Sequence, residues 1–275
     1  MAVLLALSSS VLWGGSDFVG GLLSRTRRAH AVVAGSQAFG LLAVALVVLV
    51  TGAWHGSTAW VVWAIVAGVV GAVGLVCFYT ALGCGTMGVV SPIVALGVIV
   101  PVLVGIVQGE SLDTLVVVGL VLALVGVVTA SGPELEGRAG ARPLLLAAVA
   151  GACFGAALVC IERGAQSNAL MTLTGMRVTS VGLFLLAALA LRTNGGLRPR
   201  DLGPLAVVGV GDVGANLLFA IATQRGLLSV TAVLGSLYPV VTVLLARFVL
   251  RERLRLVQQV GVVAALTGVV LLSAG

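Results

Sequence analysis

Charged side chains are scarce in this chain of 275 residues. Asp, Glu, Lys and Arg together make up 9% of the sequence, whereas hydrophobic residues make up 60%. A soluble domain carries about 25% charged residues, because its surface must be hydrated. The composition therefore excludes a soluble enzyme, a nucleic-acid-binding domain and a disordered protein. It predicts an all-α membrane protein that crosses the lipid bilayer several times.

Lysine is absent, so all fifteen positive charges are arginines. A P-loop ATPase needs a lysine for its phosphates, and this absence excludes an intrinsic ATP-driven pump of that type. The arginines lie between apolar runs, where they set topology and contact lipid headgroups. We therefore expect the lipid bilayer as a partner and no nucleic acid.

Metal-binding patterns are also missing. The four cysteines form no Cys-x-x-Cys pair, and His30 and His55 lie far from them in the sequence. A zinc site needs clustered nitrogen and sulfur ligands, so we expect neither a metal nor another cofactor. The sequence also has no Gly-x-Ser-x-Gly elbow and no acidic pair for magnesium. A lipid-modifying membrane enzyme is therefore only a minor alternative, and we do not expect an enzyme.

Apolar runs long enough to cross the bilayer as helices recur along the whole chain. We predict ten of them, at 2–23, 31–51, 60–82, 86–108, 114–131, 143–162, 169–191, 204–223, 228–250 and 256–274.

The two halves of the sequence resemble each other. When the chain is shifted by 142 residues, ten of nineteen positions match between 110–128 and 252–270. Glycine and glutamate pairs are among these matches, and a shift of 138 residues pairs Pro101 with Pro239. Apolar composition alone does not explain such pairs. We therefore predict a first repeat at 1–131, a linker at 132–142 and a second repeat at 143–275.

Five spans per repeat is an odd number, so two tandem repeats insert with opposite orientations. Inverted repeats are typical of secondary transporters, whose substrate site lies near the membrane midplane between the repeats. The sequence thus favours a transporter. A non-transporting receptor or scaffold is the alternative.

Arginines mark one side of the membrane. Twelve lie in connections that follow odd-numbered spans, and only Arg163 and Arg225 follow even-numbered ones. Because positive charge stays in the cytoplasm, this distribution places both termini outside.

Four short motifs resemble the EamA family of the drug/metabolite transporter superfamily. They are Leu12-Trp13-Gly14-Gly15-Ser16-Asp17-Phe18, Gly109-Glu110-Ser111-Leu112, Ser236-Leu237-Tyr238-Pro239 and Arg251-Glu252-Arg253-Leu254. The resemblance covers the whole chain. It implies a ten-helix carrier of small metabolites in the plasma (inner) membrane, without ATP hydrolysis and with cytoplasmic termini, opposite to the orientation that the arginines predict. Both halves in one chain are compatible with a monomer.

The resemblance also implies an arginine in the second span of each repeat. Arg177 fills this place in the second repeat, whereas Gln37 lies roughly opposite it in the first. The two halves of the site are therefore not electrostatically equivalent.

Polar groups inside spans are costly and usually face a cavity or a partner. Asp17 and Asp212 are our candidates for proton coupling, although Asp212 could instead form a structural pair with Arg177. Three prolines, Pro92, Pro101 and Pro239, are candidate hinges. The candidate substrate-binding residues are Trp13, Ser16, Gln37, Tyr79, Arg177, Asn216, Ser236 and Tyr238.

With so few charges in the spans, neutral or zwitterionic solutes fit better than strongly anionic ones. We expect secondary-active export of small metabolites, amino acids or amphipathic drugs by alternating access. Glu110 and Glu252 are expected to cap helices or to pair with arginines, and Glu162-Arg163 to mark the end of a span.

Overall fold

The computed structural model describes residues 1–55, 57–84, 90, 93–131, 141–191, 196–249 and 256–274, and the regular structure of this part is entirely helical. Its elements are α1 (Ala2–Ser24), α2 (Ala29–Thr51), α3 (Trp60–Cys84), the 3-10 helix η1 (Leu96–Val98), α5 (Ile99–Val107), α6 (Thr114–Ser131), α7 (Ala141–Leu191), the 3-10 helix η2 (Pro199–Asp201), α8 (Leu202–Thr223), α9 (Leu228–Gly235), α10 (Tyr238–Val249) and α11 (Leu256–Ala274).

Five helices of the described part are long and apolar enough to cross a membrane, namely Ala2–Ser24, Ala29–Thr51, Trp60–Cys84, Arg142–Ala190 and Pro199–Thr223. Shorter apolar helices cover Ile93–Val107, Thr114–Gly126 and Leu228–Thr242. This arrangement makes the chain a multi-pass membrane protein, while a total of ten spans stays a prediction.

The long helix α7 covers two of the expected spans because it bends at Asn168, whose backbone is extended (φ −162°, ψ 104°). The Asn168 side chain accepts a hydrogen bond from the Met171 N–H (3.0 Å) and donates one to the Ala53 carbonyl (2.8 Å). Asn168 thus caps the second half of α7 and ties the bend to the α2–α3 connection. Glu162, which was expected at the end of a span, is instead buried within the part of α7 that precedes the bend.

Two of the expected spans are interrupted. In the first half of the chain, η1 (Leu96–Val98) precedes α5. In the second half, Ser236 and Leu237 separate α9 from α10, so the expected continuous helix at 228–250 is a broken one. A shift of 138 residues, which aligns Pro101 with Pro239, places η1 on residues 234–236, so the two irregular segments overlap at Ser236.

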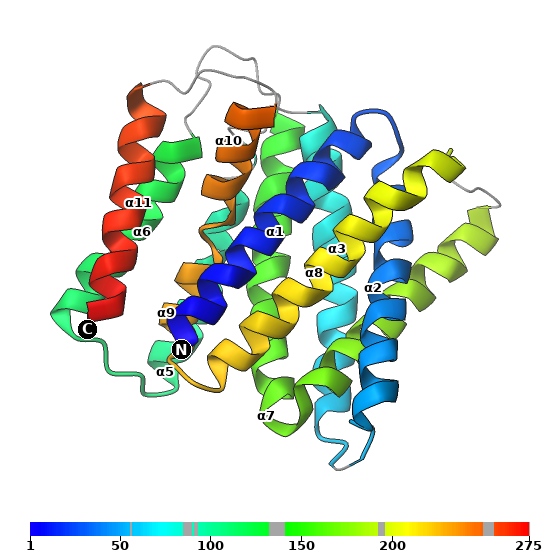
Figure 1. Cartoon of the computed structure of the whole chain (residues 1–275), viewed down its shortest axis with the longest axis horizontal. Helices are drawn as coiled ribbons and strands as arrows, with labels where there is room; N and C mark the ends of the chain where they lie inside the picture. Colours follow the sequence, from blue (N-terminus) through cyan, green and yellow to red (C-terminus); the bar gives the residue numbers. More distant parts are fainter. Residues whose placement is uncertain are drawn as a thin grey trace.

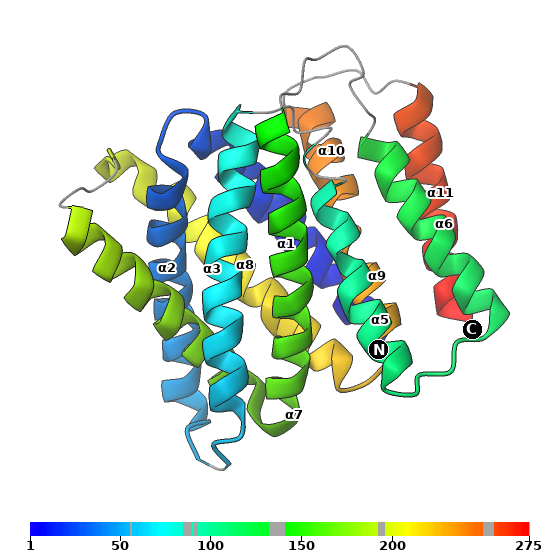
Figure 2. The ribbon, with the colours of Figure 1, turned by 180° about the vertical axis from the view of Figure 1, so that it is seen from behind.

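Helices of the two halves pack against each other throughout the molecule (Figures 1 and 2). α1 contacts α8, α3 contacts α7, and α6 contacts α11. In both views α6 and α11 lie side by side at one end of the molecule and run in opposite directions. The contact is reciprocal, since Gly126 lies against the Ala265 backbone and Gly268 against the Ala123 backbone. Such small residues let membrane helices approach closely.

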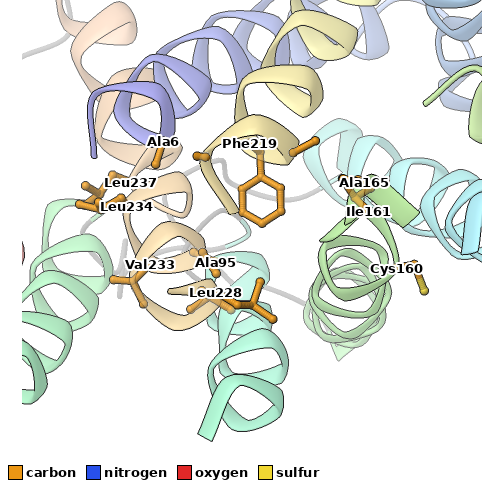
Figure 3. Packing of buried hydrophobic residues seen from close by; sticks show 14 of the residues in the cluster. Ala6, Ala95, Cys160, Ile161, Ala165, Phe219, Leu228, Val233, Leu234 and Leu237 are labelled. Carbon is orange, nitrogen blue, oxygen red and sulfur yellow. The ribbon is translucent and has the colours of Figure 1, made fainter. Parts of the chain in front are cut away.

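A buried apolar cluster fills the junction of α7, α8 and α9. Figure 3 shows the Phe219 ring of α8 between Leu228 of α9 and Ile161 of α7. Phe219 is fully buried. This packing fixes the end of α8 next to the start of α9.

Among the polar contacts that join the halves, two involve carboxylates near helix ends. The Glu110 carboxylate accepts hydrogen bonds from the Leu228 and Ser229 backbone N–H groups and from the Ser229 hydroxyl, and so caps α9. Arg27 forms two hydrogen bonds with the Asp201 carboxylate, at 2.7 and 3.2 Å. The expectation that Glu110 caps a helix is confirmed. Glu252 lies outside the described residues.

Candidate functional site

A cavity of the described part lies between the two halves and has an empty volume of about 820 Å³, including its opening. Sites for small molecules usually have mostly apolar walls with a few polar groups. Apolar side chains and glycines form most of this cavity's wall, and both interrupted spans reach it through Gly97, Val98, Gly235 and Ser236.

Arg177, on the second half of α7, is the centre of the polar side of this cavity. It is 2% exposed. Its Nη2 donates to Asp212 Oδ2 on α8 (2.6 Å), and its Nη1 donates to Gln37 on α2. Ser180, one turn further along α7, donates to the same Gln37 oxygen (3.0 Å). Three helices are therefore linked through one guanidinium group.

Both carboxylate oxygens of Asp212 accept hydrogen bonds from neighbouring side chains. Besides the bond from Arg177, its Oδ1 accepts a hydrogen bond from Asn216 Nδ2 (3.1 Å), four residues further along α8. The expected sharing of one helix face by Asp212 and Asn216 is what the structure shows. Of the two roles considered for Asp212, the structure contains the pair with Arg177.

Asp17, on α1, is in a different situation, because it forms no ion pair with any described residue. The Tyr79 hydroxyl lies beside its carboxyl group. Tyr238 is also close enough to interact with it, and the Tyr238 hydroxyl is buried without a hydrogen-bond partner in the described part. The second carboxyl group of the cavity, Asp212, lies nearby as well.

Aromatic rings complete the wall. Trp13 precedes Asp17 by four residues, so both lie on one face of α1. The Trp13 ring packs on Phe219 with 5.8 Å between centroids and lies against Gly235 of α9. Phe154 and Tyr238 also line the cavity. The site thus combines three aromatic rings with a small set of polar groups.

The structure brings most of the candidate residues together. The cavity is lined by Trp13, Asp17, Gln37, Arg177, Asp212, Asn216, Ser236 and Tyr238. Ser16 and Tyr79 are buried but do not line it. Ser16 lies against Gly211 at the α1–α8 contact, and Tyr79 lies against Gly20. Tyr79 also lines a second hollow, together with Ser24 and His30.

The candidate hinges Pro101 and Pro239 follow the interrupted segments. Pro101 is the third residue of α5 and Pro239 the second residue of α10. Proline is well tolerated in a first helical turn because the N–H that it lacks has no partner there. Each proline therefore starts a helix after a break. Pro92 lies outside the described residues.

The sequence analysis did not single out Ser180, Phe154 or Met176, which also line the cavity. A sequence pattern could have indicated two of them. Ser180 follows Arg177 by three residues and so lies on the same helix face, and Phe154 occupies the place in the second repeat that Trp13 occupies in the first. No such pattern points to Met176. No group of three metal-ligating side chains occurs among the described residues.

Comparisons with known proteins agree with this geometry. The sequence profile of the EamA-like transporter family matches residues 1–132 and 141–274. A crystal structure of another protein superposes with a TM-score of 0.78 at 19% identity, over 98% of this chain and 95% of the other, and supports the fold alone. A search of curated proteins gave no significant match.

Proposed function

This chain belongs to the EamA-like transporter family, whose profile covers both halves, and we propose that it carries small amphipathic solutes across the membrane by alternating access through the central cavity. Membership makes it a membrane transporter of the drug/metabolite type. The observation that carries the mechanism is the position of the cavity, which lies between the halves and touches the interrupted segment of each.

Interrupted helices at a site between repeats are a recurrent feature of secondary transporters, because the broken ends offer polar groups and can move. Here the breaks at η1 and at Ser236–Leu237 occupy equivalent places in the two halves. The reciprocal contacts of Gly126 and Gly268 support an inverted arrangement, since helices related by a two-fold axis exchange their contacts.

The proposed cycle rocks one half against the other about this cavity. The contacts that must change are those between halves, among them Glu110 with the start of α9 and Arg27 with Asp201. The hydrogen bond between Arg177 and Gln37 is another contact of this kind. Within the second half, the Arg177–Asp212 pair keeps α7 and α8 together during this motion. We assign proton coupling to Asp17 rather than to Asp212, because Asp212 already has a cationic partner.

Counterflow in proteoliposomes tests the carrier function. Vesicles with purified protein are loaded with a pool of amino acids, nucleosides and small amphipathic amines and then diluted into trace labelled members of each class. Accumulation of one class is the expected result. If folded protein binds a solute but accumulates none, the receptor alternative replaces the carrier.

The coupling assignment has its own test. Asp17→Asn, assayed at a solute concentration high enough to offset weaker binding, should lose the response of transport to an imposed pH gradient. Asp212→Asn is the comparison, and it should keep that response. If the pH dependence disappears with Asp212→Asn and persists with Asp17→Asn, the assignment is wrong.

A further inference from the structure

The charges of the cavity do not balance. Among the described residues that line it, the charged ones are Asp17, Arg177 and Asp212. Arg177 and Asp212 neutralise each other at 2.6 Å. With Asp17 ionised, the cavity therefore carries one uncompensated negative charge, on a carboxylate that faces the space in which a solute would lie.

No neighbouring helix supplies a counter-charge for Asp17 within the described part. The titratable and charged groups that face it are Asp212 from α8, Arg177 from α7, Tyr79 from α3 and Tyr238 from α10. Arg177 is engaged with Asp212, and the tyrosines are neutral hydroxyl groups. A lone carboxylate inside a membrane protein is costly, so its charge calls for a proton or for a cationic ligand.

The surroundings of Asp17 suit an organic cation. Trp13 lies one turn before it on α1, and Tyr238 and Phe154 contribute two more rings to the same cavity. Aromatic faces attract ammonium groups within about 6 Å of the ring centroid, most strongly where water is excluded. The Tyr238 hydroxyl, buried and unpartnered in the described part, offers an oxygen to an N–H group.

An anionic group on the solute would find little to bind. Each terminal nitrogen of Arg177 already donates a hydrogen bond, to Gln37 or to Asp212, and Asp212 compensates the Arg177 charge. The remaining nitrogen, Nε, has no hydrogen-bond partner in the described part but lies on the side of Gly40 of α2. The cavity therefore has an uncompensated negative charge for a cationic group but no uncompensated positive charge for a carboxylate. This argues against amino acids as solutes.

We propose that the cavity binds an organic monocation, a protonated amine with a small apolar body, and that Asp17 is its counter-charge, for which protons compete. Transport of this amine rests on the function proposed above, whereas its binding does not. The sequence alone favoured neutral or zwitterionic solutes because the spans hold few charges. The structure adds that Asp212 compensates the Arg177 charge, which leaves Asp17 as the uncompensated one.

A matched set of probes tests the proposal by direct binding to the full chain in detergent. The set is 2-phenylethylamine as the cation, 2-phenylethanol as the neutral analogue, phenylalanine as the zwitterion and 3-phenylpropanoate as the anion. We expect the amine to bind at least about tenfold more tightly than the other three. Amine affinity should fall as the pH is lowered, because protons neutralise Asp17.

Three variants test whether Asp17 is the counter-charge of the amine. Asp17→Asn should weaken amine binding at least about tenfold and leave 2-phenylethanol within a factor of about two. Asp113→Asn removes an exposed carboxylate outside the cavity and should retain the amine. Asp17→Glu should retain it too, and this shows that Asp17→Asn fails through charge and not through misfolding.

Several outcomes would overturn the amine proposal: tighter binding of phenylalanine or 2-phenylethanol, or unchanged amine affinity in Asp17→Asn. Counterflow with the same probes separates this proposal from the carrier function. Transport of another solute without any binding of the amine refutes the cation site and leaves the carrier intact. Binding of the amine that depends on Asp17, without accumulation of any solute, refutes the carrier and leaves the site intact.

Discussion

Arg177 is the residue on which the polar side of the cavity depends. Replacing it with methionine leaves the Asp212 carboxylate without its cation in a largely buried place. Loss of one partner of a buried ion pair destabilises a protein by about 3–5 kcal/mol, and the 16% exposure of the Asp212 side chain places the expected loss near the lower value. Thermal unfolding in detergent measures this effect. Arg225→Met, at an exposed arginine, is the matched control and should change little.

A second variant shows whether the effect comes from the unpaired charge. With Asp212→Asn added to Arg177→Met, no charge remains to be compensated, and part of the lost stability should return. If the double variant is less stable than Arg177→Met, Asp212 stabilises the fold through contacts other than the ion pair.

The contact between Arg27 and Asp201 should make the stability of the folded protein depend on pH. The hydrogen bonds from Arg27 hold the pKa of Asp201 below its ordinary value, and the Arg198 N–H contributes to the same shift. A lowered pKa adds stability above the ordinary aspartate pKa of about 3.9, and this is lost as the pH falls through the lower pKa of the folded state. Wild type should unfold at a higher temperature than Asp201→Asn from about pH 8 to pH 5, and the difference should shrink below about pH 4.

Asp113→Asn is the control for this measurement, because Asp113 is exposed. It should show no such pH-dependent difference. A difference between wild type and Asp201→Asn that grows with acidity would mean that the carboxylate destabilises the folded state.

At the scale of helices, α9 depends on a cap from the other half of the chain. The Glu110 carboxylate accepts hydrogen bonds from two backbone N–H groups in the first turn of α9. A negative charge at this end of a helix also interacts favourably with the helix dipole. Glu110→Gln keeps an acceptor but loses the charge, and should lower the free energy of unfolding by about 0.5–2 kcal/mol. The same thermal unfolding assay measures it, with Asp113→Asn, in the same connection, as control.

Activity adds a second readout for Glu110. If this contact has to open during the cycle, Glu110→Gln changes the rate of counterflow as well as stability. An unchanged rate with lowered stability would show that the contact is structural and stays closed throughout transport.

The helical segments were largely readable from the sequence, but their pairing and the directions of their side chains were not. Matching Gly126 with Gly268 and Ala123 with Ala265 identified residues that the fold places in reciprocal contact. Pro101 and Pro239 marked the places where spans are interrupted. Tyr79 and Ser16, in contrast, were expected in the cavity and face other helices. A helix that is apolar on all sides has no polar stripe to show which face is turned inward.

At the scale of the whole molecule, the distribution of arginines predicts which side faces the cytoplasm. Arginines 25, 27 and 28 follow α1, and positive charge favours the cytoplasmic side. The connection between α2 and α3 carries none. We therefore expect the α1–α2 connection inside the cell, the α2–α3 connection outside, and both termini outside, although the resemblance to the EamA family implies cytoplasmic termini.

Cysteine labelling on intact cells decides this orientation. In a chain whose four cysteines are replaced by alanine, Thr26→Cys and Ser57→Cys place single thiols at exposed sites in these two connections. A membrane-impermeant maleimide should label Ser57→Cys directly and Thr26→Cys only after the membrane is permeabilised. The reverse pattern would refute the arginine argument. It would also exchange the sides of the membrane on which the contacts between halves lie. The Glu110 cap on α9 would then lie on the cytoplasmic side and the Arg27–Asp201 pair on the outer side.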